Sequence, residues 1–319
     1  MNKKIEFTVM FLILATGNIF ILGCKQIVPA NEMPYSSVQL PQTIEQSPVV
    51  EITRAEQVMK AIAEAYSRQI EKVEYRNDDW AVLLRDTWFY YAGGKLLPEG
   101  QLENAANFSS QPFYNYQREL PIWREPSPEE AERYSNMARN RGSNPLRRST
   151  YFFDALWRAG SRSESYDRVK SILFFGNSIT VHYMILENLS LVEETILAAA
   201  KTNSQVQTWI NNISTLEGWS WRDIADTQSR SFHAYGIAVD ILPRSLGGRQ
   251  TYWLWASNSR ADWWNISYNE RFHPPAEVIQ AFETYGFIWG GKWLYFDTMH
   301  FEYRPEILVL SGMPPETRR

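Results

Sequence analysis

The sequence predicts an α+β fold, in which a small antiparallel sheet with flanking helices follows a mainly helical N-terminal region. The first observation is size, since 319 residues, 44% of them hydrophobic, suffice for one large globular domain or two ordinary ones. The second is a change of pattern along the chain. Helical spacing is common early, whereas short apolar runs alternate with Gly, Pro, Asn and Asp near the C-terminus, as expected of strands and turns. We therefore place the mainly helical region at residues 51–165 and the sheet-bearing domain at residues 166–319.

The N-terminus has the pattern of a targeting segment. Lys3 and Lys4 precede an apolar run from about Phe7 to Leu22, which is short for a membrane span and suits the core of a signal peptide. The run ends beside Cys24, the only cysteine of the chain. The segment resembles a bacterial lipoprotein signal, which implies removal of residues 1–23, a lipid on Cys24 and attachment to a membrane. A plain signal peptide or an uncleaved anchor is the alternative.

Composition restricts the partners and the possible metal ligands. Residues 24–50 are rich in Pro, Gln and Ser, so we expect a flexible tether. A lipidated Cys24 leaves no thiolate for a metal ion, so His and carboxylate side chains remain. The net charge of −4 gives no reason to expect nucleic acid as a partner. Nine of the 13 tryptophans lie between Trp209 and Trp293, which indicates core and cleft walls or, alternatively, rings along a groove for glycan or peptide.

Helical spacing of apolar residues recurs in several segments. The predicted helices cover about residues 51–71, a short segment from Pro128, and residues 150–159, 180–202 and 274–285. The last is the best marked, because prolines open it and Gly286 follows its end.

Two segments about sixty residues apart contain the residue types of a metal site. The first carries His233 and Asp240, and the second carries Asp297 and His300. Two histidines and one carboxylate around one ion, with another carboxylate three residues before the last ligand, are the inventory of a catalytic zinc site with a general base. The chain has only four histidines, so it is informative that two of them lie in segments that also carry these carboxylates.

The spacing within each segment requires a bend. Asp240 lies seven positions after His233, and in a continuous strand an odd separation puts two side chains on opposite faces. If both hold one ion, the chain must turn between them, which Gly236 permits. By the same argument, we expect a turn between Asp297 and His300.

The two segments resemble a known peptidase family. The residues from Ser231 to Asp240 match Ser-x-His-x-x-Gly-x-Ala-x-Asp, and Asp297 with His300 matches an acidic-x-x-His pair. Both patterns resemble the LAS zinc peptidases (lysostaphin, D-Ala-D-Ala peptidases and the hedgehog signalling domain), most closely the D-alanyl-D-alanine carboxypeptidase and L-alanyl-D-glutamate endopeptidase branch. The resemblance implies a LAS/hedgehog-like peptidase fold, Zn²⁺ held by His233, Asp240 and His300, and Asp297 as the general base.

Further residues are expected around this site. Arg222 occupies a place that often holds arginine in this branch, where its planar fork suits a substrate carboxylate; a structural ion pair is the alternative. Glu302 returns to the His300 side of a strand and can accept a hydrogen bond from it. For His182 and His273 we predict structural roles. The predicted substrate-binding residues are Arg222, Ser231, Trp289 and Tyr303.

The resemblance implies a zinc metallopeptidase, lipid-anchored in the bacterial cell envelope, that hydrolyses peptidoglycan stem peptides as a D-Ala-D-Ala carboxypeptidase. Many carboxypeptidases of the group have Glu where this chain has Asp297, and Asp is familiar in the endopeptidase branch, so an L-Ala-D-Glu endopeptidase is the alternative. A wall-binding lipoprotein without activity is another, although an intact Asp297 argues against it. Residues 51–165 have no assigned role; covering the cleft, binding glycan and docking a partner are the options.

Overall fold

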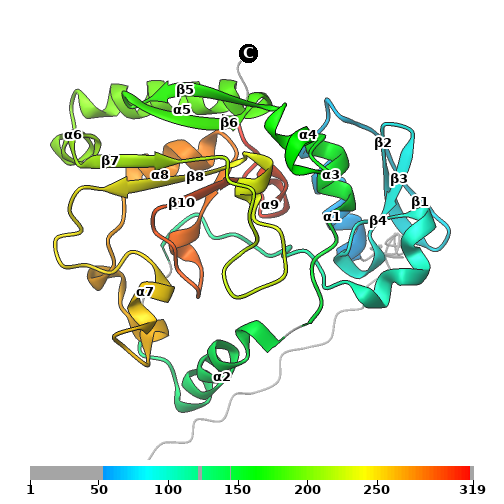
Figure 1. Cartoon of the computed structure of the whole chain (residues 1–319), viewed down its shortest axis with the longest axis horizontal. Helices are drawn as coiled ribbons and strands as arrows, with labels where there is room; N and C mark the ends of the chain where they lie inside the picture. The colour runs from blue at the N-terminus through cyan, green and yellow to red at the C-terminus, as the bar shows by residue number, and fades with distance from the viewer. Residues whose placement is uncertain (1–52, 121–123, 144, 317–319) are drawn as a thin grey trace, which may run out of the picture. The chain divides into compact units, whose positions relative to one another are not determined.

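The computed structural model describes residues 53–120, 124–143 and 145–316 (Figure 1). The predicted leader, the lipidation site Cys24 and the tether lie outside these residues. The chain divides into Met1–Val50 and Glu51–Arg319, and every described residue belongs to the second unit. Within the described ranges, no helix combines the length and apolar character needed to cross a membrane.

Helices and antiparallel strands are both present throughout the described unit, which confirms the α+β class (Figure 1). The α-helices are α1 (Arg54–Ala65), α2 (Pro128–Arg139), α3 (Tyr151–Trp157), α4 (Arg162–Tyr166), α5 (Leu186–Ala200), α6 (Ser204–Asn211), α7 (Trp253–Ser257), α8 (Ala276–Thr284) and α9 (Pro305–Leu310). The 3₁₀ helices are η1 (Ala92–Gly94), η2 (Glu99–Asn107), η3 (Arg141–Ser143), η4 (Tyr183–Ile185), η5 (Phe232–Tyr235), η6 (Trp263–Asn265), η7 (Tyr268–Glu270) and η8 (Gly290–Lys292). The strands are β1 (Ile70–Arg76), β2 (Asp79–Leu84), β3 (Thr87–Tyr90), β4 (Leu97–Pro98), β5 (Val169–Phe174), β6 (Asn177–His182), β7 (Ile213–Glu217), β8 (Ala238–Pro243), β9 (Phe287–Trp289) and β10 (His300–Tyr303).

The predicted small antiparallel sheet has the strand order β7-β8-β10-β9. Its central pair brings together the two segments of the predicted metal site, because β8 begins at Ala238 and β10 begins at His300. A separate hairpin of β5 and β6 precedes this sheet in the chain. The small antiparallel sheet that the sequence predicts is therefore present.

A second sheet lies in the region that we predicted to be mainly helical. Strands β1 to β4 form a four-stranded antiparallel meander, and helices occupy much of the rest of the region. Its two tight turns use Asn77-Asp78 and Arg85-Asp86, all four with positive φ. Paired positive φ values define the turn that matches strand twist, but glycine is its usual sequence mark. The prediction missed this sheet because neither turn contains glycine.

The helix predictions agree with the structure in position but not in every boundary. Helix α2 begins at Pro128, and α8 ends just before Gly286, as predicted; a capping box, which was not predicted, opens α2. The first predicted helix, residues 51–71, is shorter as α1, because the chain enters strand β1 at Ile70. The helix predicted over residues 180–202 begins later, because residues up to His182 belong to strand β6.

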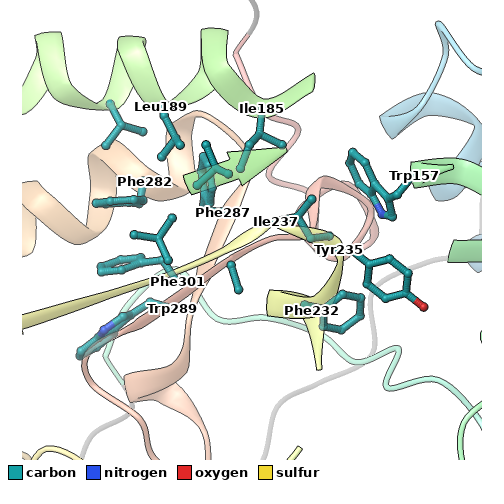
Figure 2. Close-up of a cluster of buried hydrophobic side chains, with 14 of the residues drawn as sticks. Trp157, Ile185, Leu189, Phe232, Tyr235, Ile237, Phe282, Phe287, Trp289 and Phe301 are labelled. Atoms are coloured by element: carbon teal, nitrogen blue, oxygen red, sulfur yellow. The ribbon is translucent and has the colours of Figure 1, made fainter. Parts of the chain in front are cut away.

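One hydrophobic core supports the site-bearing sheet and extends into the N-terminal region. Phe282 of α8 stacks on Phe301 of β10 with ring centroids 3.9 Å apart, and Leu189 of α5 lies in the same cluster (Figure 2). Trp157 of α3 and Val58 of α1 belong to that cluster as well. The predicted boundary at residue 166 thus falls inside a shared core, so the N-terminal region packs with the sheet that carries the site.

His182 has the structural role that we predicted, and its burial makes stability depend on pH. Its Nε2–H donates to the Trp157 carbonyl at 2.9 Å, and its Nδ1 accepts from the Met184 amide at 3.2 Å. Burial lowers the pKa of His182 from 6.5 to about 4. Because the folded pKa is the lower one, the unfolded chain binds this proton more tightly. The stability that neutral His182 contributes is therefore present above pH 6.5 and is lost as the pH falls towards 4.

Between pH 7 and pH 4.5, the free energy of unfolding of the wild type is expected to fall. In His182→Gln, this fall is expected to be smaller by about 2–3 kcal/mol. Glutamine can keep a donor and an acceptor at this position, but it does not titrate. Urea unfolding at both pH values, with a chelator present so that metal ligands stay empty, measures the difference. Equal pH dependence in the two proteins would show that His182 titrates normally in the folded state.

Candidate metal centre

His233 and Asp240 face the same place because the chain bends between them. The Ser231 Oγ accepts a hydrogen bond from the His233 amide at 3.3 Å and so begins η5. Gly236 ends η5 with φ +72°, and a Cβ there would lie 2.8 Å from a Val169 methyl group. Only glycine fits both the conformation and the space. The predicted bend at Gly236 is confirmed.

A turn brings Asp297 and His300 to the same cavity, as predicted. The His300 amide donates to the Asp297 carbonyl at 3.3 Å, and the Met299 amide donates to the Asp297 carboxylate at 3.3 Å. His300 then opens β10 and pairs directly with Asp240 of β8. This strand register places a ligand from each segment side by side.

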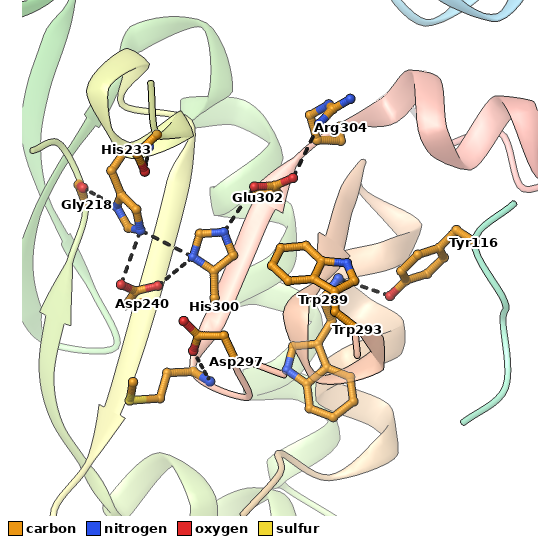
Figure 3. A network of polar contacts seen from close by, with 12 residues as sticks. Tyr116, Gly218, His233, Asp240, Trp289, Trp293, Asp297, His300, Glu302 and Arg304 are labelled. Carbon is orange, nitrogen blue, oxygen red and sulfur yellow. Dashed lines mark hydrogen bonds and ion pairs between the residues drawn. The ribbon is translucent and has the colours of Figure 1, made fainter. Parts of the chain in front are cut away.

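His233, Asp240 and His300 form a compact buried cluster with the dimensions of a zinc site (Figure 3). His233 Nε2 and His300 Nδ1 lie 3.3 Å apart, and they lie 3.2 and 2.8 Å from the two Asp240 oxygens, respectively. In a tetrahedral site with ligand distances of about 2.0–2.1 Å, ligand atoms are about 3.3 Å apart. The three side chains therefore fit one face of a zinc tetrahedron.

The outward nitrogens of both imidazoles have acceptors that set the tautomers. His233 Nδ1–H donates to the Gly218 carbonyl at 2.6 Å, and His300 Nε2–H donates to the Glu302 carboxylate at 3.1 Å, as the strand alternation predicted. Each ring then directs a lone pair inward, which is the arrangement that second partners of metal-binding histidines produce. Figure 3 shows these contacts on either side of the cluster.

Charges in the cluster keep its carboxylates ionised. Burial alone would raise the pKa of Asp240, but His233 and His300 hold it well below its usual range. Burial likewise opposes ionisation of Glu302, yet the hydrogen bond and the charge of His300 lower its pKa. Burial disfavours a charged His300, but Asp240 and Glu302 raise its pKa well above 6.5, so without metal this ring attracts a proton. A cation between the ligands replaces that proton.

Asp297 stands outside the ligand triangle, with its carboxylate on the cavity wall (Figure 3). Burial, followed by the negative charge of Asp240, raises the pKa of Asp297 to about 7. A carboxylate whose pKa lies near neutrality is suited to accept and return a proton. This position and this environment are those expected of a general base.

The cavity in front of the cluster has a volume of about 590 Å³. The predicted substrate-binding residues Arg222 and Ser231 line it. The clustering of tryptophans between Trp209 and Trp293 is explained in part, because Trp253, Trp255 and Trp293 are walls of this cavity. The aromatic lining residues are Tyr114, Phe232, Tyr252, Trp253, Trp255, Trp293 and Tyr295.

Trp289 and Tyr303 do not line this cavity, and their predicted substrate contacts require correction. Trp289 is fully buried, and its indole N–H donates to the Thr298 carbonyl at 3.0 Å, so it holds the turn between Asp297 and His300. Tyr303 follows Glu302 on β10 and therefore lies on the opposite face of the strand. The sequence resemblance marked the right segments but did not reveal which face each side chain occupies.

Sequence analysis missed other residues of the site. The Gly218 carbonyl is a backbone group, which no residue pattern marks. Tyr114, Arg141 and Arg148 line the cavity but come from the region that had no assigned role. Trp293 lines the cavity in place of Trp289; its position four residues after Trp289 was the available signal.

The buried His-Asp-His cluster has the ligand set of a metal centre. Residues 225–303 match a family model described as D-alanyl-D-alanine carboxypeptidase, and residues 58–113 match a domain of unknown function (DUF8518). No curated protein and no solved structure matches the chain. The first match contains His233, Asp240, Asp297 and His300, so the resemblance to LAS-type zinc peptidases is confirmed. The family match and the ligand cluster together support a zinc-dependent metallopeptidase.

Replacing Glu302 by Gln is expected to lower zinc affinity by about 10- to 100-fold, because the His300 ring loses the anion that orients it. Competition with a chromogenic chelator measures the affinity. The matched control is Glu71→Gln, an exposed carboxylate of β1 remote from the site. An unchanged affinity in Glu302→Gln would mean that the His300 tautomer is set by other groups.

Proposed function

We propose that this protein is a zinc metallopeptidase that hydrolyses the stem peptides of peptidoglycan, as a D-Ala-D-Ala carboxypeptidase. The observation that carries the proposal is the convergence of His233, Asp240 and His300 with a free Asp297 on one cavity. The family match over residues 225–303 supports the substrate class. The alternative is a wall-binding protein that keeps the metal ligands but has no activity. This alternative leaves the free Asp297 unexplained.

The chemistry divides between the ion and the side chains of the chain. Bound Zn²⁺ supplies Lewis acidity, which activates water at neutral pH and stabilises negative charge on a carbonyl oxygen. Asp297 accepts a proton from the attacking water and returns it to the leaving amine. Arg222 offers its fork to a carboxylate of the peptide at the same cavity. The surrounding rings restrict solvent, which strengthens these charge interactions.

Purified zinc-loaded protein and muropeptides of defined composition test the proposal. Loss of a single D-Ala, detected by mass spectrometry, is the expected result. Separation at L-Ala would instead assign the L-Ala-D-Glu endopeptidase activity, which the aspartate at position 297 favours by resemblance. No product from either bond, with zinc content verified, would refute the peptidase function.

We further propose that the protein acts at the bacterial cell envelope, anchored through a lipid on Cys24. The support is the leader pattern and the lone cysteine of the sequence, together with a substrate class found in the cell wall. Metabolic labelling with a lipid analogue tests the anchor: Cys24→Ser is expected to abolish the label, and a label that persists would contradict it.

A further inference from the structure

Two arginines that precede the matched segment lie on the wall of the metal cavity. Arg141 in η3 and Arg148, in the same stretch of chain, line it together with the three ligands. Both belong to the region without an assigned role, and neither lies within residues 58–113 or 225–303. We call Arg141 and Arg148 the cavity arginines.

Arg141 is held flat by aromatic rings. Its guanidinium carbon lies 4.7 Å from the Trp253 ring centroid and 4.2 Å from that of Tyr295. Stacking of this kind orients the guanidinium plane and leaves its N–H donors free. Its Nε is buried and has no hydrogen-bond partner in the described part of the chain. The donors of Arg141 are therefore oriented but unused.

Arg148 is tied to the site by its backbone, and its side chain lines the cavity without an ion pair to a described residue. Its amide donates to the Ser229 Oγ at 3.0 Å, two residues before Ser231. With the described residues its side chain forms no hydrogen bond and no ion pair. Burial lowers the pKa of Arg148; the charge of Glu302 raises it, and that of nearby Arg141 lowers it. Glu302 therefore offsets part of the charge of Arg148, but no ion pair joins the two side chains, and the guanidinium donors stay available to a ligand anion.

Arg230, Arg271 and Arg304 have partners within the protein, although the Arg168 Nε and one Arg304 nitrogen are, like the Arg141 Nε, buried without a hydrogen-bond partner in the described part of the chain. Arg230 pairs with Asp154 at 2.5 Å, and Arg304 pairs with Glu306. Arg271 donates from Nε to the Ile266 carbonyl at 3.0 Å. The cavity arginines differ from Arg230, Arg271 and Arg304 because their side chains line the cavity and form no hydrogen bond or ion pair with a described residue, so their donors are available to a ligand anion.

Arg222 lines the same cavity as the cavity arginines but belongs to another segment of the chain, shortly before Ser231. One peptide in the cavity therefore meets guanidinium groups from two segments of the chain.

We propose that the cavity arginines bind an internal carboxylate of the substrate, distinct from the terminal carboxylate held by Arg222, and so select acidic over amidated peptides. This inference rests on the proposed peptidase function. It gives the N-terminal region a role in specificity, since that region supplies both guanidinium groups. Paired charged hydrogen bonds of this kind change binding by about tenfold or more.

Three synthetic stem pentapeptides test the proposal. The first, L-Ala-γ-D-Glu-L-Lys-D-Ala-D-Ala, has a free internal carboxylate; the second has a carboxamide there; the third has a carboxamide only at the C-terminus. Wild-type protein is expected to favour the first over the second by about tenfold or more in kcat/KM. The double variant Arg141→Gln, Arg148→Gln is expected to treat these two alike while still discriminating against the third. Arg147→Gln, an exposed neighbour, is the control and is expected to behave as wild type.

A binding measurement separates this inference from the proposed function. Calorimetry with zinc-loaded Asp297→Asn protein compares the affinities of the same peptides without turnover. Preference for the internal carboxylate that disappears with the two arginines supports the inference, even where no bond is cut. Equal wild-type affinity for the first two peptides overturns it without any variant. A preference that survives in a folded double variant, or a loss of discrimination only against the terminal amide, overturns it as well.

Discussion

Replacing Asp297 by Asn is expected to lower kcat by about 10³-fold while each chain still binds one Zn²⁺. The amide has the shape of the carboxylate, but it cannot accept the proton that hydrolysis requires. Metal binding should persist because Asp297 lies outside the cluster of His233, Asp240 and His300. Steady-state kinetics with a stem peptide and elemental analysis of the same sample measure both quantities.

The matched control is Asp226→Asn. Asp226 is exposed and has φ +58°, a conformation that Asn tolerates well, so this substitution removes a charge near the site without strain. Its kcat should equal that of the wild type. A loss of zinc in Asp297→Asn would instead make Asp297 a ligand, and full activity would show that another group accepts the proton.

Replacing His233 by Ala is expected to abolish stoichiometric zinc binding and reduce turnover to background. One imidazole and one carboxylate remain, and a structural or catalytic zinc site in proteins requires at least three protein ligands. The Gly218 carbonyl also loses its donor in the buried site. Elemental analysis after dialysis, together with thermal unfolding with and without chelator, provides the measurement.

The unfolding data distinguish loss of metal from loss of fold. Chelator should lower the melting temperature of the wild type and leave that of His233→Ala unchanged, because bound metal stabilises only a protein that binds it. His273→Ala is the control, since this half-buried histidine lies outside the ligand cluster. A His233→Ala protein that retains one zinc per chain would place the metal elsewhere.

Short-range features of the site followed from the sequence because they depend on a few consecutive residues. The left-handed conformation of Gly236 and the turn after Asp297 are required by residue spacing and strand parity alone. The capping box that opens α2 and the glycine after α8 are likewise local signals. The bends, the helix start near Pro128 and the glycine after α8 were predicted and are confirmed, whereas the capping box was not predicted.

Side-chain direction and long-range partners did not follow from the sequence. Trp289 was predicted to bind substrate, yet the packing of neighbouring elements buries it under the turn and leaves Trp293 on the cavity. The meander of β1 to β4 was missed because its turns lack glycine, and positive φ at Asn, Asp and Arg is decided by strand pairing.

By itself, the sequence determined the metal-binding residue types, their spacing and the bends that this spacing demands, because these depend on chain geometry over fewer than ten residues. Only the tertiary structure decided that β8 and β10 pair with Asp240 opposite His300, and that the N-terminal region lines the same cavity. Such contacts join residues 60 or more positions apart and depend on the packing of a common core, on which local spacing places no constraint.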